Sequence, residues 1–198
     1  MDFDLIPNTA PEAAANSAIS VGDETLSLLA EKAFERLSFT FTETHLKHLL
    51  DAAADCRSSE NDRFVCSFLL KNAIIAARGE LPLCQDTGTA QIFAWKDEGV
   101  LSTCDPYAAL ERGAKETWAD RNLRNSTNLP LSLFEETDPG DNMPAQIVLF
   151  AGRGAGKSRG NPAWHFLFCA KGGGSSNKTQ LFQATKALLE PKAFDAFL

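Results

Sequence analysis

The stretch from residue 81 to residue 90 places three chemically active side chains on consecutive residues. Cys84, Gln85 and Asp86 offer a thiol, an amide and a carboxylate, and Gly88 follows two residues later. A thiolate binds soft metal centres, and a carboxylate can take up or release a proton. Consecutive side chains diverge on a helix and alternate between the two faces of a strand. We therefore expect these residues on a loop, where the backbone can direct all three to one point.

A glycine-rich stretch, Lys-Gly-Gly-Gly-Ser-Ser-Asn-Lys at residues 171–178, is the second place where the sequence suggests ligand binding. Three consecutive glycines let a backbone approach a ligand closely, and Ser176 or Asn177 can cap the helix expected after them. N–H groups at such a helix N-terminus attract a carboxylate or a phosphate. A plain turn between a strand and a helix fits the same residues, and the pattern leaves both interpretations open.

Residues 151–158 loosely match a nucleotide-binding P-loop. A P-loop needs a helix that begins at its Lys-Ser pair, because the N-terminus of that helix holds the phosphate. Gly160 and Pro162 follow instead and prevent such a helix. We therefore interpret this stretch as a hairpin connection.

The remaining cysteines and histidines lack the spacing of a metal site. The chain has five cysteines, an odd number without close pairing, which is typical of reduced thiols in a cytosolic protein. Cys56, Cys66 and Cys104 are expected to pack as apolar residues. His45 and His48 lie three residues apart, and the solvated edge of a helix is favoured over a metal pair.

Composition excludes several classes of protein. The formal net charge of −7 argues against a surface for nucleic acid or for an anionic membrane, because both need clustered Lys and Arg. The longest apolar run is too short to cross a membrane. The first basic residue is Lys32, which fits neither a signal peptide nor a transit peptide. We expect a cytoplasmic protein of one domain.

The predicted fold class is mixed α/β, with N-terminal helices followed by a small mixed sheet with flanking helices. We expect a flexible N-terminal arm over residues 1–22. The first helix should begin at a cap on Asp23 or Thr25. The other elements expected from periodicity are helices over about 44–54, 61–79, 105–124 and 181–189, a strand over 90–95, and buried strands over 146–150 and 164–169.

Together the motifs resemble class I fumarate hydratase, the iron–sulfur-dependent hydro-lyase family that also includes tartrate dehydratases. Cys-Gln-Asp-Thr-Gly at residues 84–88, combined with the glycine-rich stretch at 171–178, is specific to this family. The matching motifs keep the family's order from about residue 25 to about residue 190. The other matching motifs lie at residues 61–64, 70–73 and 122–124, and at residue 142 with residues 144–147.

The resemblance implies a role for each residue. Cys84 corresponds to one of three thiolates that hold a [4Fe–4S] cluster, in which one iron keeps an open position and acts as a Lewis acid. Gln85 and Asp86 correspond to substrate contacts, with Asp86 as the proton carrier. Arg124 corresponds to an arginine that binds a substrate carboxylate, and Gly174 to a backbone contact in the same site.

The resemblance also implies that this chain holds only part of the site. In the family the other two cluster cysteines follow the glycine-rich stretch, and the first of them belongs to an Ala-Cys-Pro-Pro motif that is absent here. Residues 23–198 then form an incomplete alpha-type catalytic domain. Its complete enzyme would interconvert fumarate and malate, with the remaining C-terminal part as a partner, and would be a homo-oligomer.

Two other functions remain open from the sequence. A truncated non-catalytic homologue could dimerise or bind a partner, and a small-anion-binding module could use Arg124 with the glycine-rich stretch. A gene that reads on past Leu198 into an Ala-Cys-Pro-Pro motif would favour the hydro-lyase.

We predict that the 198-residue chain alone holds no stable [4Fe–4S] cluster, because Cys84 supplies one thiolate and clusters of this type use several. Anaerobic reconstitution with iron and sulfide, followed by visible absorption, measures this. A stoichiometric, oxygen-sensitive cluster in the purified chain would contradict the prediction.

Overall fold

The computed structural model describes residues 18–152 and 162–172, together with residues 183 and 185. The predicted helix over residues 181–189 and most of the glycine-rich stretch therefore lie outside the described residues. The described elements confirm the predicted class, mixed α/β with helices before a small mixed sheet. Their bounds are β1 Ile19–Val21, α1 Asp23–Phe39, α2 Glu43–Ala54, α3 Glu60–Ala76, β2 Thr89–Lys96, β3 Val100–Ser102, α4 Pro106–Asp120, β4 Leu129–Pro130, β5 Glu136–Thr137, β6 Gln146–Ala151 and β7 Trp164–Lys171.

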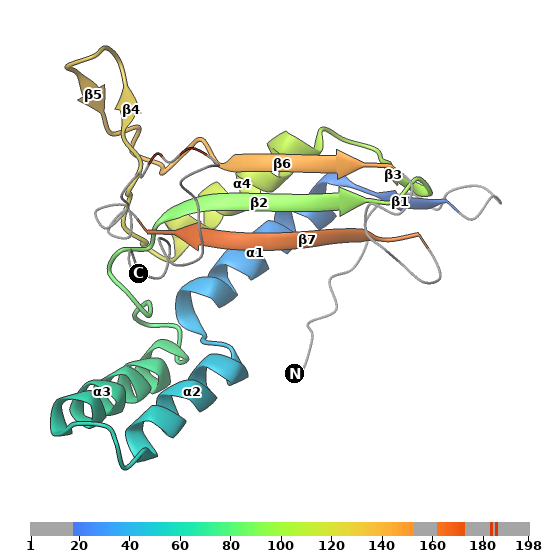
Figure 1. The fold of residues 1–198 in the computed structure, drawn as a ribbon. Coiled ribbons are helices and arrows are strands. Elements are labelled where there is room, and N and C mark those ends of the chain that lie inside the picture. Colours follow the sequence, from blue (N-terminus) through green and yellow to red (C-terminus); the bar gives the residue numbers. More distant parts are fainter. Residues whose placement is uncertain (1–17, 153–161, 173–182, 184, 186–198) are drawn as a thin grey trace.

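A three-stranded mixed sheet of order β6-β2-β7 organises the molecule (Figure 1). The central strand β2 pairs in parallel with β6, placing Gln91 opposite Gln146, and antiparallel with β7, placing Thr89 opposite Lys171. The Gln91 side chain donates across the β2–β6 pair to Gln146 at 2.7 Å. Because of these directions, the N-terminal ends of β2 and β6 meet the C-terminal end of β7 at one edge of the sheet.

One face of this sheet packs against α1 and forms the core. Ala90, Ile92 and Ala94 alternate along β2 with more exposed residues and are completely buried. The expectation that β6 and β7 are buried strands is wrong, because their outward-facing residues stay exposed. Val148 and Leu167, for example, remain about half exposed on the opposite face. Both strands therefore follow the alternating pattern of a sheet with one packed face.

Helices α1 and α4 pack closely against each other beneath the sheet (Figure 1). A Cβ atom at Gly113 of α4 would lie 2.0 Å from the carbonyl oxygen of Ser27 in α1, so only glycine allows this approach. Phe34 of α1 is completely buried and contacts Trp118 and Phe168 edge to face, with ring centroids 5.4 and 5.5 Å apart. This aromatic cluster joins α1, α4 and β7.

The cap predicted for the first helix is wrong. Gly22 is the N-cap of α1, and no side chain caps this end. Asp23 lies in the first turn and accepts two hydrogen bonds from the guanidinium of Arg112 in α4, at 2.5 and 3.3 Å. The Asp23 carboxylate, which the sequence suggested as a cap, therefore forms a bidentate ion pair with Arg112 instead.

The predicted end of the fourth helix is also wrong. Asp105 caps the N-terminus of α4, and its carboxylate accepts a hydrogen bond from the Tyr107 backbone N–H at 2.9 Å. The helix ends at Asp120 rather than at Arg124, and Asn122 then adopts a left-handed conformation with φ of 50°. Arg124 therefore lies in the segment after the helix rather than in its last turn.

Helices α2 and α3 form a hairpin that extends away from the sheet (Figure 1). Ser59 and Asp62 form a capping box at the start of α3. No residue of α2 is buried, and α3 buries only Cys66, Ala73 and Ala76. Several large apolar side chains of the hairpin are exposed, namely Leu50, Phe64, Val65, Phe68, Leu69, Ile74 and Ile75. We call these seven residues the hairpin apolar surface.

Two small sheets complete the described structure. Residues 19–21, within the segment expected as an arm, form β1 and pair in parallel with β3. Strands β4 and β5 form a short antiparallel hairpin. None of the described helices combines the length and the apolar character that a bilayer-spanning segment needs.

We predict that Phe34→Ala lowers the free energy of unfolding by about 3–5 kcal/mol, because it leaves a cavity among Trp118 and Phe168. Phe134→Ala is the control, since that ring is 92% exposed and its loss should change stability by no more than about 0.5 kcal/mol. Urea denaturation measures both. Equal losses in the two variants would show that the aromatic cluster does not hold α1 to the sheet.

Candidate functional site

The Cys84–Gln85–Asp86 triplet lies on the loop between α3 and β2, as the sequence predicts. Leu83 anchors the start of this loop. Its N–H donates to the Ser38 carbonyl at 2.8 Å, and its own carbonyl accepts from the Asn72 side chain at 2.8 Å. Cys84 and Gln85 are exposed, and Asp86 is half-buried. The loop therefore presents a thiol and an amide to solvent with a carboxylate behind them.

The segment that carries Arg124 lies beside this loop. The Thr87 hydroxyl donates to the Arg124 carbonyl at 2.6 Å, across 37 positions of sequence. The Ser126 hydroxyl donates a long hydrogen bond of 3.4 Å to Asp86 Oδ1. The Arg124 side chain is exposed. A cation and a carboxylate therefore come from two segments that hydrogen bonds hold together.

The beginning of the glycine-rich stretch lies against the same loop. A Cβ atom at Gly172 would lie 2.8 Å from Asp86 Oδ2, and one at Gly88 would lie 2.6 Å from the Lys171 carbonyl carbon. Gly88 also has a φ of +71°, which glycine adopts without strain. Gly88 is thus required where the end of β7 passes the Asp86 loop, and a side chain at Gly172 would crowd the Asp86 carboxylate.

Asn142 is the residue that sequence reasoning left without a role. It is completely buried, and its Oδ1 accepts from the backbone N–H groups of Ser126 and Thr127 at 2.6 and 2.9 Å. Its Nδ2 donates to the Gly88 carbonyl at 2.9 Å. The only signal in the sequence was its place in one of the motifs shared with the hydro-lyase family.

The structure brings together three of the predicted segments, namely the 84–88 loop, residues 124–127 and the start of the glycine-rich stretch. Gly174, predicted as a backbone contact, lies outside the described residues. Among the residues described, the side chains of Cys84, Gln85 and Arg124 make no hydrogen bond to one another. Their roles toward a ligand therefore stay predictions.

The donor set fits one ligand of a metal cluster rather than a whole cluster site. Within residues 18–152 and 162–172, no three His, Cys, Asp or Glu side chains are grouped so that they could hold a metal ion. Cys84 is an exposed thiol. Any further thiolates would have to come from outside these residues.

The other cysteines and the histidine pair are placed as follows. Cys66 is buried and Cys104 half-buried, in line with packing roles, whereas Cys56 is exposed and the packing role predicted for it is wrong. His45 and His48 lie on exposed parts of α2, the solvated edge that the sequence favoured.

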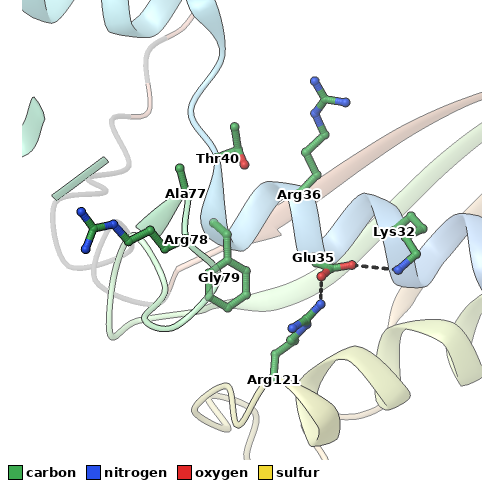
Figure 2. Close-up of a pocket in the computed structure, with 9 residues that line it drawn as sticks. Lys32, Glu35, Arg36, Thr40, Ala77, Arg78, Gly79 and Arg121 are labelled. Carbon is green, nitrogen blue, oxygen red and sulfur yellow. Dashed lines mark hydrogen bonds and ion pairs between the residues drawn. The ribbon is translucent and has the colours of Figure 1, made fainter. Parts of the chain in front are cut away.

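A separate hollow of about 570 Å³ lies between the end of α1, the turn after α3 and the end of α4. Its lining includes four cationic side chains, Lys32, Arg36, Arg78 and Arg121. Figure 2 shows that Lys32 and Arg121 both reach Glu35, whereas Arg36 and Arg78 point away from it. Glu35 thus pairs with two of the four cations, and the lining keeps a net positive charge.

An ion pair fixes the residue before Asn142. Lys115 of α4 lies 2.9 Å from Asp141, and the Met143 backbone N–H donates to the same carboxylate at 3.1 Å. The hydrogen bond from Lys115 is the main reason that the pKa of Asp141 lies below its ordinary value, and it raises the pKa of Lys115. The Ala145 N–H also donates to Glu111 of α4, at 3.1 Å.

Comparison with known proteins identifies close relatives. Residues 27–196 match the family model described as fumarate hydratase (fumerase). The chain is 44% identical over 180 residues to the aerobic class I fumarate hydratase of Escherichia coli K12, covering 91% of this chain and 32% of that protein. It is 42% identical to the anaerobic class I enzyme of the same organism, with the same coverage. It is 41% identical over 187 residues to fumarate hydratase 2 of Leishmania major, covering 94% and 32%. The chain thus spans about a third of the length of these relatives.

We predict that Asp141→Asn destabilises the chain slightly at pH 7, and that this difference from the wild type disappears in acid. A carboxyl whose pKa is lowered in the folded state contributes its full stability above the ordinary pKa of 3.8. That contribution is lost as pH falls through the lower pKa of the folded state. The pair is largely exposed, so the effect is small and weakens in salt.

Thermal unfolding of both proteins between pH 7 and pH 3 measures this difference. Asp138→Asn is the control, because this exposed residue accepts a hydrogen bond from the Gly140 N–H that an asparagine can also accept. A difference between Asp141→Asn and the wild type that persists unchanged at pH 3 would contradict the prediction.

Proposed function

Because the chain belongs to the class I fumarate hydratase family, we propose that it supplies part of the active site of a hydro-lyase. The reaction is the reversible addition of water to fumarate, which gives malate. The observation that carries the proposal is the meeting of the 84–88 loop, the Arg124 segment and Gly172 at one edge of the sheet, in a chain that matches the family over residues 27–196.

In this proposal each segment performs one task. The Arg124 guanidinium binds a substrate carboxylate, for which a planar two-pronged donor is well suited. Gln85 and Asp86 contact the substrate, and Gly174 offers a backbone N–H. Asp86 carries a proton to or from the substrate carbon skeleton, and its half-buried position beside Ser126 keeps its carboxylate directed at the site.

Cys84 is proposed as one of the thiolates of a [4Fe–4S] cluster in the complete enzyme. Such a cluster supplies a Lewis-acidic iron that polarises the substrate's oxygen atoms. The described residues supply one thiol at this place.

The proposed partners are the part of the enzyme outside this chain and a second copy of the complete protein, in the cytoplasm. The hairpin apolar surface supports a partner, because it leaves Phe64 and Ile74 about 60% exposed, and exposed apolar side chains gathered on one element often mark an interface.

The same surface favours a second function, that of a non-catalytic homologue which binds a partner. The two functions differ in what they require of the 84–88 loop. A partner-binding protein tolerates changes at Cys84 and Asp86, whereas a hydro-lyase does not.

A chimera tests the proposal, with this chain replacing the matching third of the aerobic E. coli enzyme. After anaerobic reconstitution, the loss of fumarate absorbance measures hydration. Turnover well above that of the E. coli remainder alone supports the hydro-lyase. A folded, reconstituted chimera without turnover would favour the partner-binding homologue.

We predict that Asp86→Asn in the active chimera lowers turnover by about 10²–10⁴-fold and leaves cluster absorbance intact, because Asn resembles Asp in shape but cannot transfer a proton. Cys84→Ser should lose the cluster absorbance itself, because a hydroxyl ligates iron–sulfur centres poorly. Visible absorption and hydration rates separate the two effects. Near-normal turnover in Asp86→Asn, or loss of its cluster, would assign Asp86 a structural role.

A further inference from the structure

Asn142 connects two segments that have no regular hydrogen-bond pairing with each other. It lies directly before the Met143–Pro144 bond that leads into β6, at the edge of the sheet where β2 begins. From there its side chain reaches Gly88, 54 positions away, and Ser126 and Thr127, 16 and 15 positions away. A single amide, that of Asn142, therefore hydrogen-bonds both the Asp86 loop and the Arg124 segment.

The chemistry of this position suits asparagine. Two backbone N–H groups need an acceptor and one carbonyl needs a donor, and a single amide side chain supplies both. The backbone of Asn142 has a φ of +59°, a left-handed conformation that asparagine adopts more readily than most residues. Asn142 and Gly88 are buried and Ser126 and Thr127 are half-buried, so losing the amide would deprive the Gly88 carbonyl and both N–H groups of their partner within the protein.

The position of the Asp86 carboxylate depends on both ends of this link. Gly88 lies two residues after Asp86 on the loop, and Ser126, whose backbone N–H Asn142 accepts, donates its hydroxyl to Asp86 Oδ1. Displacing either segment therefore moves the carboxylate relative to Arg124. The Thr87–Arg124 hydrogen bond is a second, shorter link between the same segments.

We propose that Asn142 is a positioning residue that holds the Asp86 loop and the Arg124 segment in one geometry for the substrate. The link between the two segments stands without the proposed function, and only the reaction for which it positions them rests on that function. Asn142 itself does not touch the substrate.

Two substitutions separate its tasks. Asn142→Gly removes the amide and keeps the left-handed backbone free of strain. Asn142→Asp keeps the acceptor for Ser126 and Thr127 but, when ionised, loses the donor to Gly88. The matched control is Thr117→Val, which removes a buried hydroxyl that bonds Glu31 and Gly113 between α1 and α4, away from the loop.

The first measurement is amide NMR on the 198-residue chain. In Asn142→Gly, the Ser126 and Thr127 amides should exchange at least about tenfold faster, because each loses its hydrogen bond to the Asn142 side chain. In Asn142→Asp they should stay protected. In both variants the order parameters of residues 85–87 should fall from about 0.85 toward 0.6, while Thr117→Val leaves them unchanged. Unchanged order parameters in both variants, or an equal fall in Thr117→Val, would overturn the proposal.

The second measurement is hydration by the chimera. Both Asn142 variants should lower kcat/KM by about 10- to 100-fold more than Thr117→Val does, because small misplacements of reacting groups have effects of this size. Wild-type kcat/KM in both variants of an active chimera would overturn the proposal. An inactive parent chimera would count against the proposed function alone, since the NMR result decides the positioning role by itself.

Discussion

The described structure depends on β2 being paired along both edges and buried on one face. Neighbouring strands bond the backbone of β2 on both sides, and Ala90, Ile92 and Ala94 are buried on the packed face of the sheet. A strand held in this way cannot slide without moving its apolar side chains to the other face. The Asp86 loop leads directly into β2, so the C-terminal end of this loop is held in a fixed position. The close approach of α1 and α4 at Gly113 in turn fixes where the Arg124 segment begins.

Outside the paired strands, side-chain hydrogen bonds rather than strand pairing fix the backbone conformation of the site. Thr87 and Asn142 are buried polar residues, and each bonds a backbone group far away in sequence. Gly88 and Gly172 matter for a different reason, since a Cβ atom at Gly88 would collide with the Lys171 backbone and one at Gly172 would crowd the Asp86 carboxylate. The irregular backbone of the site is thus held in place by a few hydrogen bonds from Thr87 and Asn142 and by close approaches at two glycines.

The sequence predicted much of this arrangement, and the failures have physical causes. Periodicity located α2, α3 and β2, and the three adjacent polar side chains at residues 84–86 indicated the loop that carries Asp86, because these are local properties of the chain. It misjudged the start of α1, since Asp23 bonds Arg112 across 89 positions, and it extended α4 past the left-handed Asn122. Asn142 escaped attention because its partners are backbone groups, which leave no trace in residue type.

The direction of β7 has a consequence for how the chain can change over evolution. Both ends of the β6–β7 connection lie beside the far end of β2, where the Gly152 N–H donates to Lys96 and Asp97 donates to Ala163. The eight residues of β2, roughly 25 Å of strand, separate that end from the Asp86 loop. A change in the length of this connection therefore enters the described fold at the end of β2 opposite the Asp86 loop.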